Sequence, residues 1–285
     1  MDSVASSKIL CAVDMGESTK SVLQWANLFA IQQDRRLAVE ILHALWIDVP
    51  LYFTSSQITE LASHIRNEKA TVESALHKIA RTSLSPEVDF RINIVEGDAI
   101  SAIDTRLGQD PVELIAMGTH GRSGANRLLL GSVAEHVLRI AQPPVLVIPP
   151  GIRASDIGIR RILCPVNFTE RSRLTLDSCS HLAQRFKAEL SILHVVEGEA
   201  DIGLTKSKLC SWISDDVRSR CEVSEVVRKG SAAEQVIRTA VETAADLILL
   251  RAEHRPFLEF TTIGTTTERV IRHSPCAAYV IPIRG

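Results

Sequence analysis

Short apolar runs alternate along the first half of the chain with stretches in which apolar residues recur at helical spacing. In the first such stretch, Val22, Trp25 and Phe29 would lie on one face of a helix. Strands and helices in alternation are typical of βαβ units, which build a parallel sheet. The apolar runs predict five strands, at Ile9–Val13, Ala38–Trp46, Phe90–Val95, Leu114–Met117 and Val145–Ile148.

Four helices are expected between and after these strands. The second is long and amphipathic, over residues 58–79, and the third covers residues 98–108 with Asp98 as its N-cap. The fourth should begin where a capping-box sequence occurs, and the second half of the chain has a matching one. These two sequences are Ser132-Val133-Ala134-Glu135 and Thr265-Thr266-Thr267-Glu268.

The chain contains this pattern twice. Residues 8–14 return as residues 161–167, and residues 97–149 align without a gap on residues 230–282. Most of the shortening of the second copy falls between its second and third expected strands. A tandem repeat predicts two similar units, so there are two places at which to look for a site.

At 285 residues, the chain is long enough for two domains that each bury a core. We expect an α/β protein of two domains, residues 1–150 and 158–285, joined by a linker that contains Pro and Gly. Each domain should be a doubly wound, five-stranded parallel sheet of the Rossmann-like or flavodoxin-like type.

Composition narrows the classes of partner and location. A net charge of −2 gives no general attraction to nucleic acid or to an anionic membrane, so neither partner is expected. The N-terminus lacks the basic start and apolar core of a signal peptide, and we expect a soluble, cytoplasmic protein. The six cysteines show no CxxC pair and no zinc spacing, so buried reduced thiols are expected and a metal is not.

Unusual residues gather where such a sheet binds ligands, outside the carboxyl ends of its strands and at the reversal of winding between the first and fourth strands. Asp14 ends the first strand, and Gly118-Thr119-His120-Gly121 follows the fourth. Gly131-Ser132 opens the last helix, whose N–H groups and positive dipole end suit an anion. Arg122 and Arg127 give the intervening loop a charge of +2 without any acidic residue, so the loop should attract a triphosphate.

Neither a Walker A sequence nor GxGxxG occurs, which disfavours a P-loop ATPase and a dinucleotide dehydrogenase. The spacing G-x2-G-x9-G-[ST] instead resembles the universal stress protein family, and the likeness extends over nearly the whole chain through both repeats. This resemblance implies an adenosine pocket in which Asp14 takes the ribose hydroxyls while Val13 and Ala44 flank the base. It also implies backbone contacts to the phosphates from Gly118, Gly121, Arg122, Gly131, Ser132 and Val133.

Several of these residues have a purely structural alternative. Ser132 and Asp14 could cap the helices that follow them, and the side chains of His120, Arg122 and Arg127 could be solvated. His43 lies inside a strand and is expected to be a hydrogen-bonded core residue.

The second copy departs from the motif. Arg251 and His254 stand where Gly118 and Gly121 stand in the first copy, and Asn167 replaces Asp14. The charge of the loop falls to zero, since Glu253 and Glu259 offset its arginines. Losing two charge-assisted contacts weakens binding by roughly two to four orders of magnitude. We therefore expect the second site to be structural or to take a different ligand.

Together with these features, the family resemblance implies a stress-associated, ATP-binding regulatory protein that binds ATP, ADP or AMP, with or without Mg, in its first domain only. No nucleophile elbow or HExxH motif is present, so slow ATP hydrolysis is the most we expect. Two alternatives stay open: an adenine-nucleotide-using enzyme of related fold, and a scaffold that works by protein contacts alone.

The last strands of the two domains, Val145–Ile148 and Ala278–Ile281, should pair or pack across a pseudo-twofold axis. Each would otherwise leave a sheet edge open, and the family resemblance implies dimerisation through this strand. The linker makes the pair an intramolecular pseudo-dimer. A homodimer of whole chains and the protein partner stay undetermined.

Overall fold

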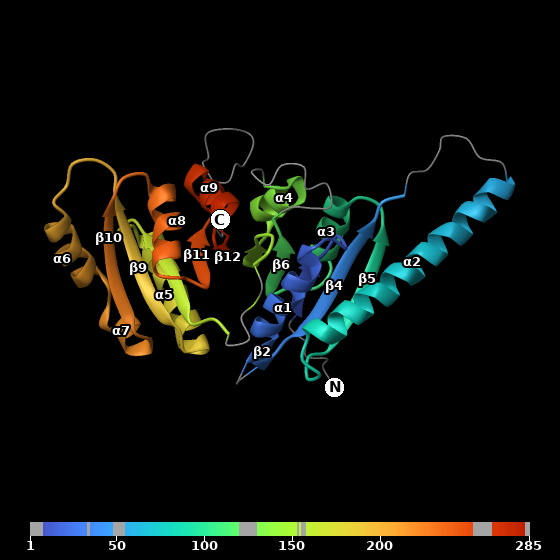
Figure 1. Cartoon of the computed structure of the whole chain (residues 1–285), viewed down its shortest axis with the longest axis horizontal. Coiled ribbons are helices and arrows are strands. Elements are labelled where there is room, and N and C mark those ends of the chain that lie inside the picture. Colours follow the sequence, from blue (N-terminus) through green and yellow to red (C-terminus); the bar gives the residue numbers. More distant parts are fainter. Residues whose placement is uncertain are drawn as a thin grey trace.

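The structure is a computed structural model that describes residues 8–32, 35–47, 55–119, 130–152, 154, 158–252 and 264–282. Its main feature is one ten-stranded sheet in the order β10-β9-β8-β11-β12-β7-β6-β1-β4-β5 (Figure 1). The first half contributes β1 (Lys8–Ala12), β4 (Ala38–Leu45), β5 (Phe90–Glu96), β6 (Leu114–Gly118) and β7 (Val145–Ile148). The second contributes β8 (Arg161–Val166), β9 (Glu189–Val196), β10 (Val223–Lys229), β11 (Leu247–Arg251) and β12 (Ala277–Ile281).

The five predicted strands of the first half are confirmed, with ends that differ by at most one residue. All neighbouring strands within each half are parallel. The order within each half reverses after its first strand, as in a doubly wound sheet. A separate two-stranded ribbon, β2 (Ile31–Gln32) with β3 (Arg35–Arg36), follows the first helix.

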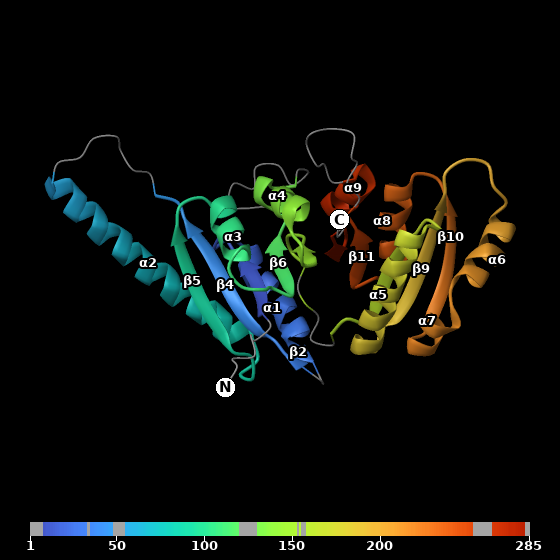
Figure 2. The same ribbon diagram turned by 180° about the vertical axis from the view of Figure 1, so that it is seen from behind.

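Helices cover both faces of the sheet (Figures 1 and 2). Apolar residues of the strands alternate between the two faces, so that Ile9 and Cys11 belong to one buried cluster and Leu10 to the other. The first cluster is covered by α1 (Ser18–Ala30), α2 (Ser55–Ser83), α5 (Glu170–Phe186), α6 (Ile202–Trp212) and α7 (Asp215–Arg220). The second is covered by α3 (Ala99–Leu107), α4 (Ser132–Ile140), α8 (Ala232–Glu242) and α9 (Thr265–His273).

The second half differs from the first in its helices. Among its described residues it has five helices, because α6 and α7 occupy the part of the chain that matches α2 in the first half. The predicted four helices are therefore found in the first half only. Figure 1 shows that the N-terminal end of α2 extends away from the sheet. No helix in the described ranges is both long and apolar enough to cross a membrane.

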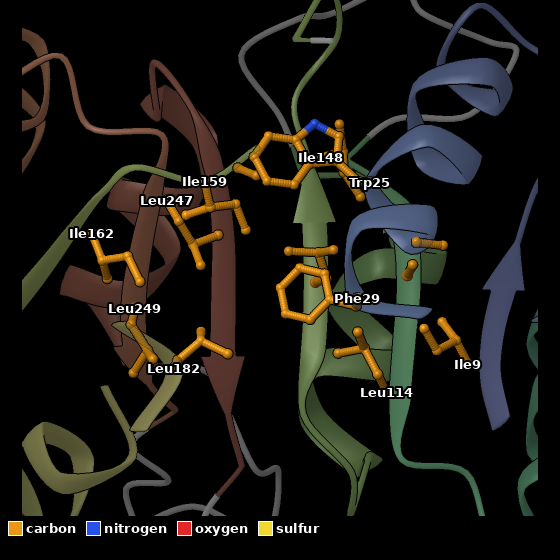
Figure 3. Packing of buried hydrophobic residues seen from close by; sticks show 14 of the residues in the cluster. Ile9, Trp25, Phe29, Leu114, Ile148, Ile159, Ile162, Leu182, Leu247 and Leu249 are labelled. Atoms are coloured by element: carbon orange, nitrogen blue, oxygen red, sulfur yellow. The ribbon is translucent and has the colours of Figure 1, made fainter. Parts of the chain in front are cut away.

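The two halves join through their last strands, as predicted. β12 pairs antiparallel with β7, and Tyr279 lies opposite Leu146. Over this junction, the ring of Phe29 from α1 stacks on Tyr279 at 5.7 Å and meets Phe186 of α5 edge-on at 5.2 Å. Figure 3 shows Trp25 and Phe29 against β7. The two clusters of buried residues therefore continue from one half into the other.

The two predicted capping boxes are wrong. The N-caps are Gly131 for α4 and Gly264 for α9, and neither helix has a side-chain cap. Gly131 takes this position because its backbone is extended and its N–H donates to the Thr119 carbonyl at 2.8 Å. Glu268 forms an ion pair with Arg272, one turn further along α9.

A buried ion cluster lies between β4, β5 and α3. Glu40 has no exposed surface, and its carboxylate accepts hydrogen bonds from Arg106, which is 2% exposed, and from Arg91. Burial alone would raise the pKa of Glu40, but the hydrogen bonds and charges of the two arginines lower it to about 2. The carboxylate is therefore charged at neutral pH and holds α3 against the sheet.

Candidate functional site

A cavity of about 240 Å³ opens at the carboxyl ends of β1 and β6, the predicted reversal of winding. This volume is slightly below the usual range for small-molecule sites. Gly121 and Arg122, two of the predicted site residues, lie outside the described residues, as do His120 and Arg127. The structure brings the other seven predicted residues together in the wall of this cavity: Val13, Asp14, Ala44, Gly118, Gly131, Ser132 and Val133.

The remaining wall is mostly apolar. Ala12, Leu42 and Met117 contribute from the strands, and the start of α3 contributes Ala99 and Ala102. Sequence reasoning missed α3 as part of the site. The sequence carries no clear signal for this, because alanine has no distinctive chemistry and only the packing of α3 brings these residues to the cavity. Asp14 is the one charged side chain among the described lining residues.

Asp14 lines this cavity, and one of its carboxylate oxygens is buried. Its Oδ1 accepts the Gly16 N–H at 2.9 Å, whereas its Oδ2 is buried and has no hydrogen-bond partner among the described residues. Asp14 does not cap α1, since Glu17 is the N-cap of that helix. A lone buried carboxylate oxygen is costly unless a donor reaches it, so this atom fits a ligand that donates hydrogen bonds.

Gly16, which sequence reasoning missed, keeps this carboxylate in place. A Cβ at Gly16 would lie 2.9 Å from Asp14 Oδ1, closer than real contacts allow. The preceding residue, Met15, has a left-handed backbone with φ of 63°. The turn after β1 is therefore shaped so that its amide holds Asp14.

The start of α4 forms the opposite side of the cavity. Gly131, Ser132 and Val133 all line it, and no side chain of the described residues caps the helix. The first turn of a helix has N–H groups without partners inside the helix, and its dipole favours negative charge. An uncapped helix start in a cavity wall is suited to an anion such as phosphate.

His43 has the core role that was predicted for it. Its side chain is buried, and its Nδ1 is 2.8 Å from the carbonyl oxygen of Val13. In the second half, His194 makes the same contact with the Val166 carbonyl at 2.9 Å. The histidine thus fixes the end of the first strand in each half, next to the cavity.

The second half has its own cavity of about 350 Å³ at the matching place between β8 and β11. Its polar residues differ from those of the first. The Oδ1 of Asn167 accepts hydrogen bonds from Thr169 at 2.7 Å and from Ser172 at 2.5 Å. Arg171 and Arg251 line the cavity. His254 and the two acidic residues of the matching loop lie outside the described residues.

Known proteins related to the chain by sequence all point to one family. A family model described as the Universal stress protein family matches residues 6–149 and 217–282, more than half of the chain. Universal stress protein MJ0531 of Methanocaldococcus jannaschii is 36% identical over 89 residues, which cover 31% of this chain and 51% of that protein. Universal stress protein Rv2319c of Mycobacterium tuberculosis is 23% identical over 193 residues, covering 60% of this chain and 64% of that protein. This chain therefore spans about half of the first relative and less than two thirds of the second.

Solved structures share the complete two-domain fold. A universal stress protein from Archaeoglobus fulgidus superimposes with a TM-score of 0.70 at 20% identity, covering 97% of this chain and 98% of its own. A functionally unknown protein from Pseudomonas aeruginosa, PA1789, gives a TM-score of 0.60 at 17% identity, with coverage of 98% and 93%. At such identities the likeness shows the fold alone.

Proposed function

Because the chain belongs to the universal stress protein family, we propose that it is a stress-response protein that binds one adenine nucleotide, ATP or its hydrolysis product, in its N-terminal domain. The observation that carries this proposal is the buried Oδ2 of Asp14, a residue of the cavity wall, which has no hydrogen-bond partner within the described ranges. The two hydroxyls of a ribose are donors that such an oxygen lacks.

The rest of the first cavity fits the same ligand. Val13, Ala44 and Ile103 provide apolar walls for a flat base. The uncapped first turn of α4 would hold the phosphates through backbone N–H groups, and Gly118 and Gly131 leave room for close approach. Mg would be optional in this arrangement, because the backbone and the helix dipole supply the contacts to the phosphates.

We assign binding to this site and not catalysis. The described lining residues offer the Asp14 carboxylate and the hydroxyls of Ser18, Thr119 and Ser132, without a histidine or cysteine to activate a nucleophile. Occupancy would act by ordering the first turn of α4 and so changing the surface that a protein partner meets. Hydrogen exchange should show added protection of that turn when ATP is present, and unchanged protection would count against this regulatory role.

Calorimetry tests the stoichiometry. The intact chain should bind one equivalent of ATP. Gly131→Val should abolish binding, since a branched side chain would enter the space of the phosphates, whereas Gly264→Val at the matching place should leave binding unchanged. Circular dichroism should show that both variants stay folded.

Four results would contradict the assignment. Two equivalents of similar affinity, or loss of binding by the Gly264 variant alone, would move the site out of the first domain. Turnover of nucleotide in excess of the bound amount would favour an enzyme. Failure to bind any adenine nucleotide would favour a scaffold that works by protein contacts alone.

A further inference from the structure

The cavity of the second half carries positive side chains, whereas the described lining of the first cavity has none. Arg251 ends β11 at the place of Gly118, and its side chain lines the cavity. Arg171, in the first turn of α5, lies at the exposed edge of the same cavity. Two guanidinium groups therefore share a cavity of about 350 Å³.

Neither arginine has a counter-charge within the described part of the chain. No ion pair joins them to a described acidic residue, and the Nε of Arg251 is buried without a hydrogen-bond partner there. Burial and the neighbouring charge of Arg171 lower the pKa of Arg251. A buried cationic donor without a partner is unfavourable, and an anion between the two groups would satisfy both.

The one carboxylate in the described wall is already engaged. Glu197 Oε1 accepts the backbone N–H of Ala232 at 3.0 Å, at the start of α8. It therefore compensates the N-terminus of that helix. Among the described residues, the side of the cavity near β11 is therefore positive.

The start of α9 adds further donors on that side. Gly264 is its N-cap without a side-chain cap, and Thr265 and Thr266 line the cavity. The side chain of Thr267 donates to the Arg251 carbonyl at 3.1 Å, which ties the helix start to the end of β11. Two guanidinium groups and an uncapped helix start surround the same space, as phosphate requires.

The residue of this cavity that matches Asp14 offers no free acceptor to a nucleoside within the described part of the chain. The Oδ1 of Asn167 already accepts two hydroxyl hydrogen bonds, whereas Asp14 in the first cavity has an unpartnered oxygen. Arg251 also occupies space that Gly118 leaves open. We propose that the second cavity binds the phosphate group of a small ligand, free phosphate or a phosphomonoester, and excludes adenosine.

Arginine side-chain NMR on the full chain tests this proposal at the site itself. Addition of inorganic phosphate should shift the Nε–Hε signal of Arg251 in a saturable way, and adenosine should not. A sugar phosphomonoester in a second titration separates the two sources, because tighter binding than phosphate indicates a phosphomonoester and equal binding indicates free phosphate. Since the signal is local, the result does not depend on whether the first domain binds ATP.

Substitutions of the two arginines should lower the phosphate affinity by amounts that the structure predicts. Arg251→Gln and Arg171→Gln should each weaken phosphate binding at least tenfold, because each removes a charge-assisted contact. Arg173→Gln is the matched control, since this arginine lies on the same helix but stacks over Trp212 at 4.8 Å. Its phosphate affinity should change by less than twofold. Circular dichroism should match the unaltered chain in all three variants.

The opposite results would overturn the proposal. These are an Arg251 signal that phosphate does not move, an equal loss in the Arg173 variant, or adenosine binding that shifts the Arg251 signal.

Discussion

Asp14 and Asn167 closely follow the first strand of their respective halves, and yet they present opposite hydrogen-bonding needs. Asp14 keeps one buried oxygen unpartnered, whereas Asn167 is saturated by Thr169 and Ser172. Gly16 stands where Thr169 stands in the second half, so the first half has no local hydroxyl at this place to satisfy the carboxylate. Two halves with the same strand order therefore offer different cavities because a few residues at strand ends differ.

The interiors of the two halves also differ at matching places, where one half has charged residues and the other has neutral ones. Glu40, Arg91 and Arg106 form the buried ion cluster of the first half. The matching residues of the second half are Ser191, Ser224 and Thr239, of which the two serines share a hydrogen bond of 3.0 Å. In each set two residues lie opposite each other on adjacent strands, and the third lies on the helix that packs over them. The strand order thus tolerates an ionic and a neutral cluster at one place.

The largest effect should come from breaking the ion cluster. Arg106→Thr, which imposes the residue of the second half, should lower the free energy of unfolding by about 3–5 kcal/mol, because Glu40 stays buried without its main partner. The double variant Glu40→Ser with Arg106→Thr should regain most of this loss. Urea denaturation followed by circular dichroism measures both.

Thr239→Val is the control in the second half. Its Oγ1 is buried without a partner among the described residues, so removing the hydroxyl should leave the stability unchanged or slightly raised. Equal losses for Arg106→Thr and the double variant would show that the cluster is not a unit.

Acid should remove the stability that the Glu40 ion cluster contributes. The pKa of Glu40 is about 2 in the folded chain, below its usual value of 4.5, so its contribution is complete above pH 4.5 and is lost as the pH falls toward 2. Over that window the unaltered chain should lose stability relative to the double variant. Urea midpoints measured from pH 6 to pH 2.5 test this, and parallel curves would contradict the assigned pKa.

A smaller effect is expected on ATP binding when Asp14 of the first cavity is replaced by asparagine, the residue at the matching place in the second half. Asp14→Asn should weaken ATP binding by about ten- to a hundredfold, since it replaces a charged acceptor by a neutral one. The reverse change, Asn167→Asp, should not create a second ATP site, because Arg251 still occupies the place of Gly118. Calorimetry that finds Asp14→Asn unaltered would remove the ribose role.

The smallest effect should follow from Gly16→Ala. The added Cβ would push Asp14 Oδ1 aside, and ATP should bind up to about tenfold more weakly. Gly108→Ala is the matched control, as the nearest atoms to its Cβ would lie 3.6 Å away, an ordinary contact. Binding should differ between the two variants although both fold as the unaltered chain does.

The fold could be predicted because it depends on apolar periodicity, which is visible locally in runs such as Val145–Ile148. Pairing of the last strands followed from the family resemblance. The cluster of Glu40 and Arg106 could not be predicted, since these residues are far apart in the chain and are polar in segments where apolar residues were sought. The capping boxes failed because a glycine one position earlier could take the N-cap, which local sequence does not decide.

Only part of the candidate site could be predicted, because only some of its residues are distinctive in the local sequence. Residues at strand ends and helix starts, such as Asp14 and Gly131, stand out from apolar surroundings and could be found. Ala99 and Ala102 could not be assigned to the cavity, because alanine has no distinctive chemistry and only the packing of α3 brings it there. Gly16 was missed since its importance lies in the distance to a neighbouring carboxylate.

The antiparallel pair of β7 and β12 also bears on how the protein responds to dilution. Two separate domains that met through these strands would dissociate as their concentration fell. Here residues 150–158 tether them, and a short tether gives an effective local concentration of about a millimolar. The junction should therefore persist at any cellular abundance of the chain. With that edge of β7 occupied from within, a second chain would have to associate through another surface.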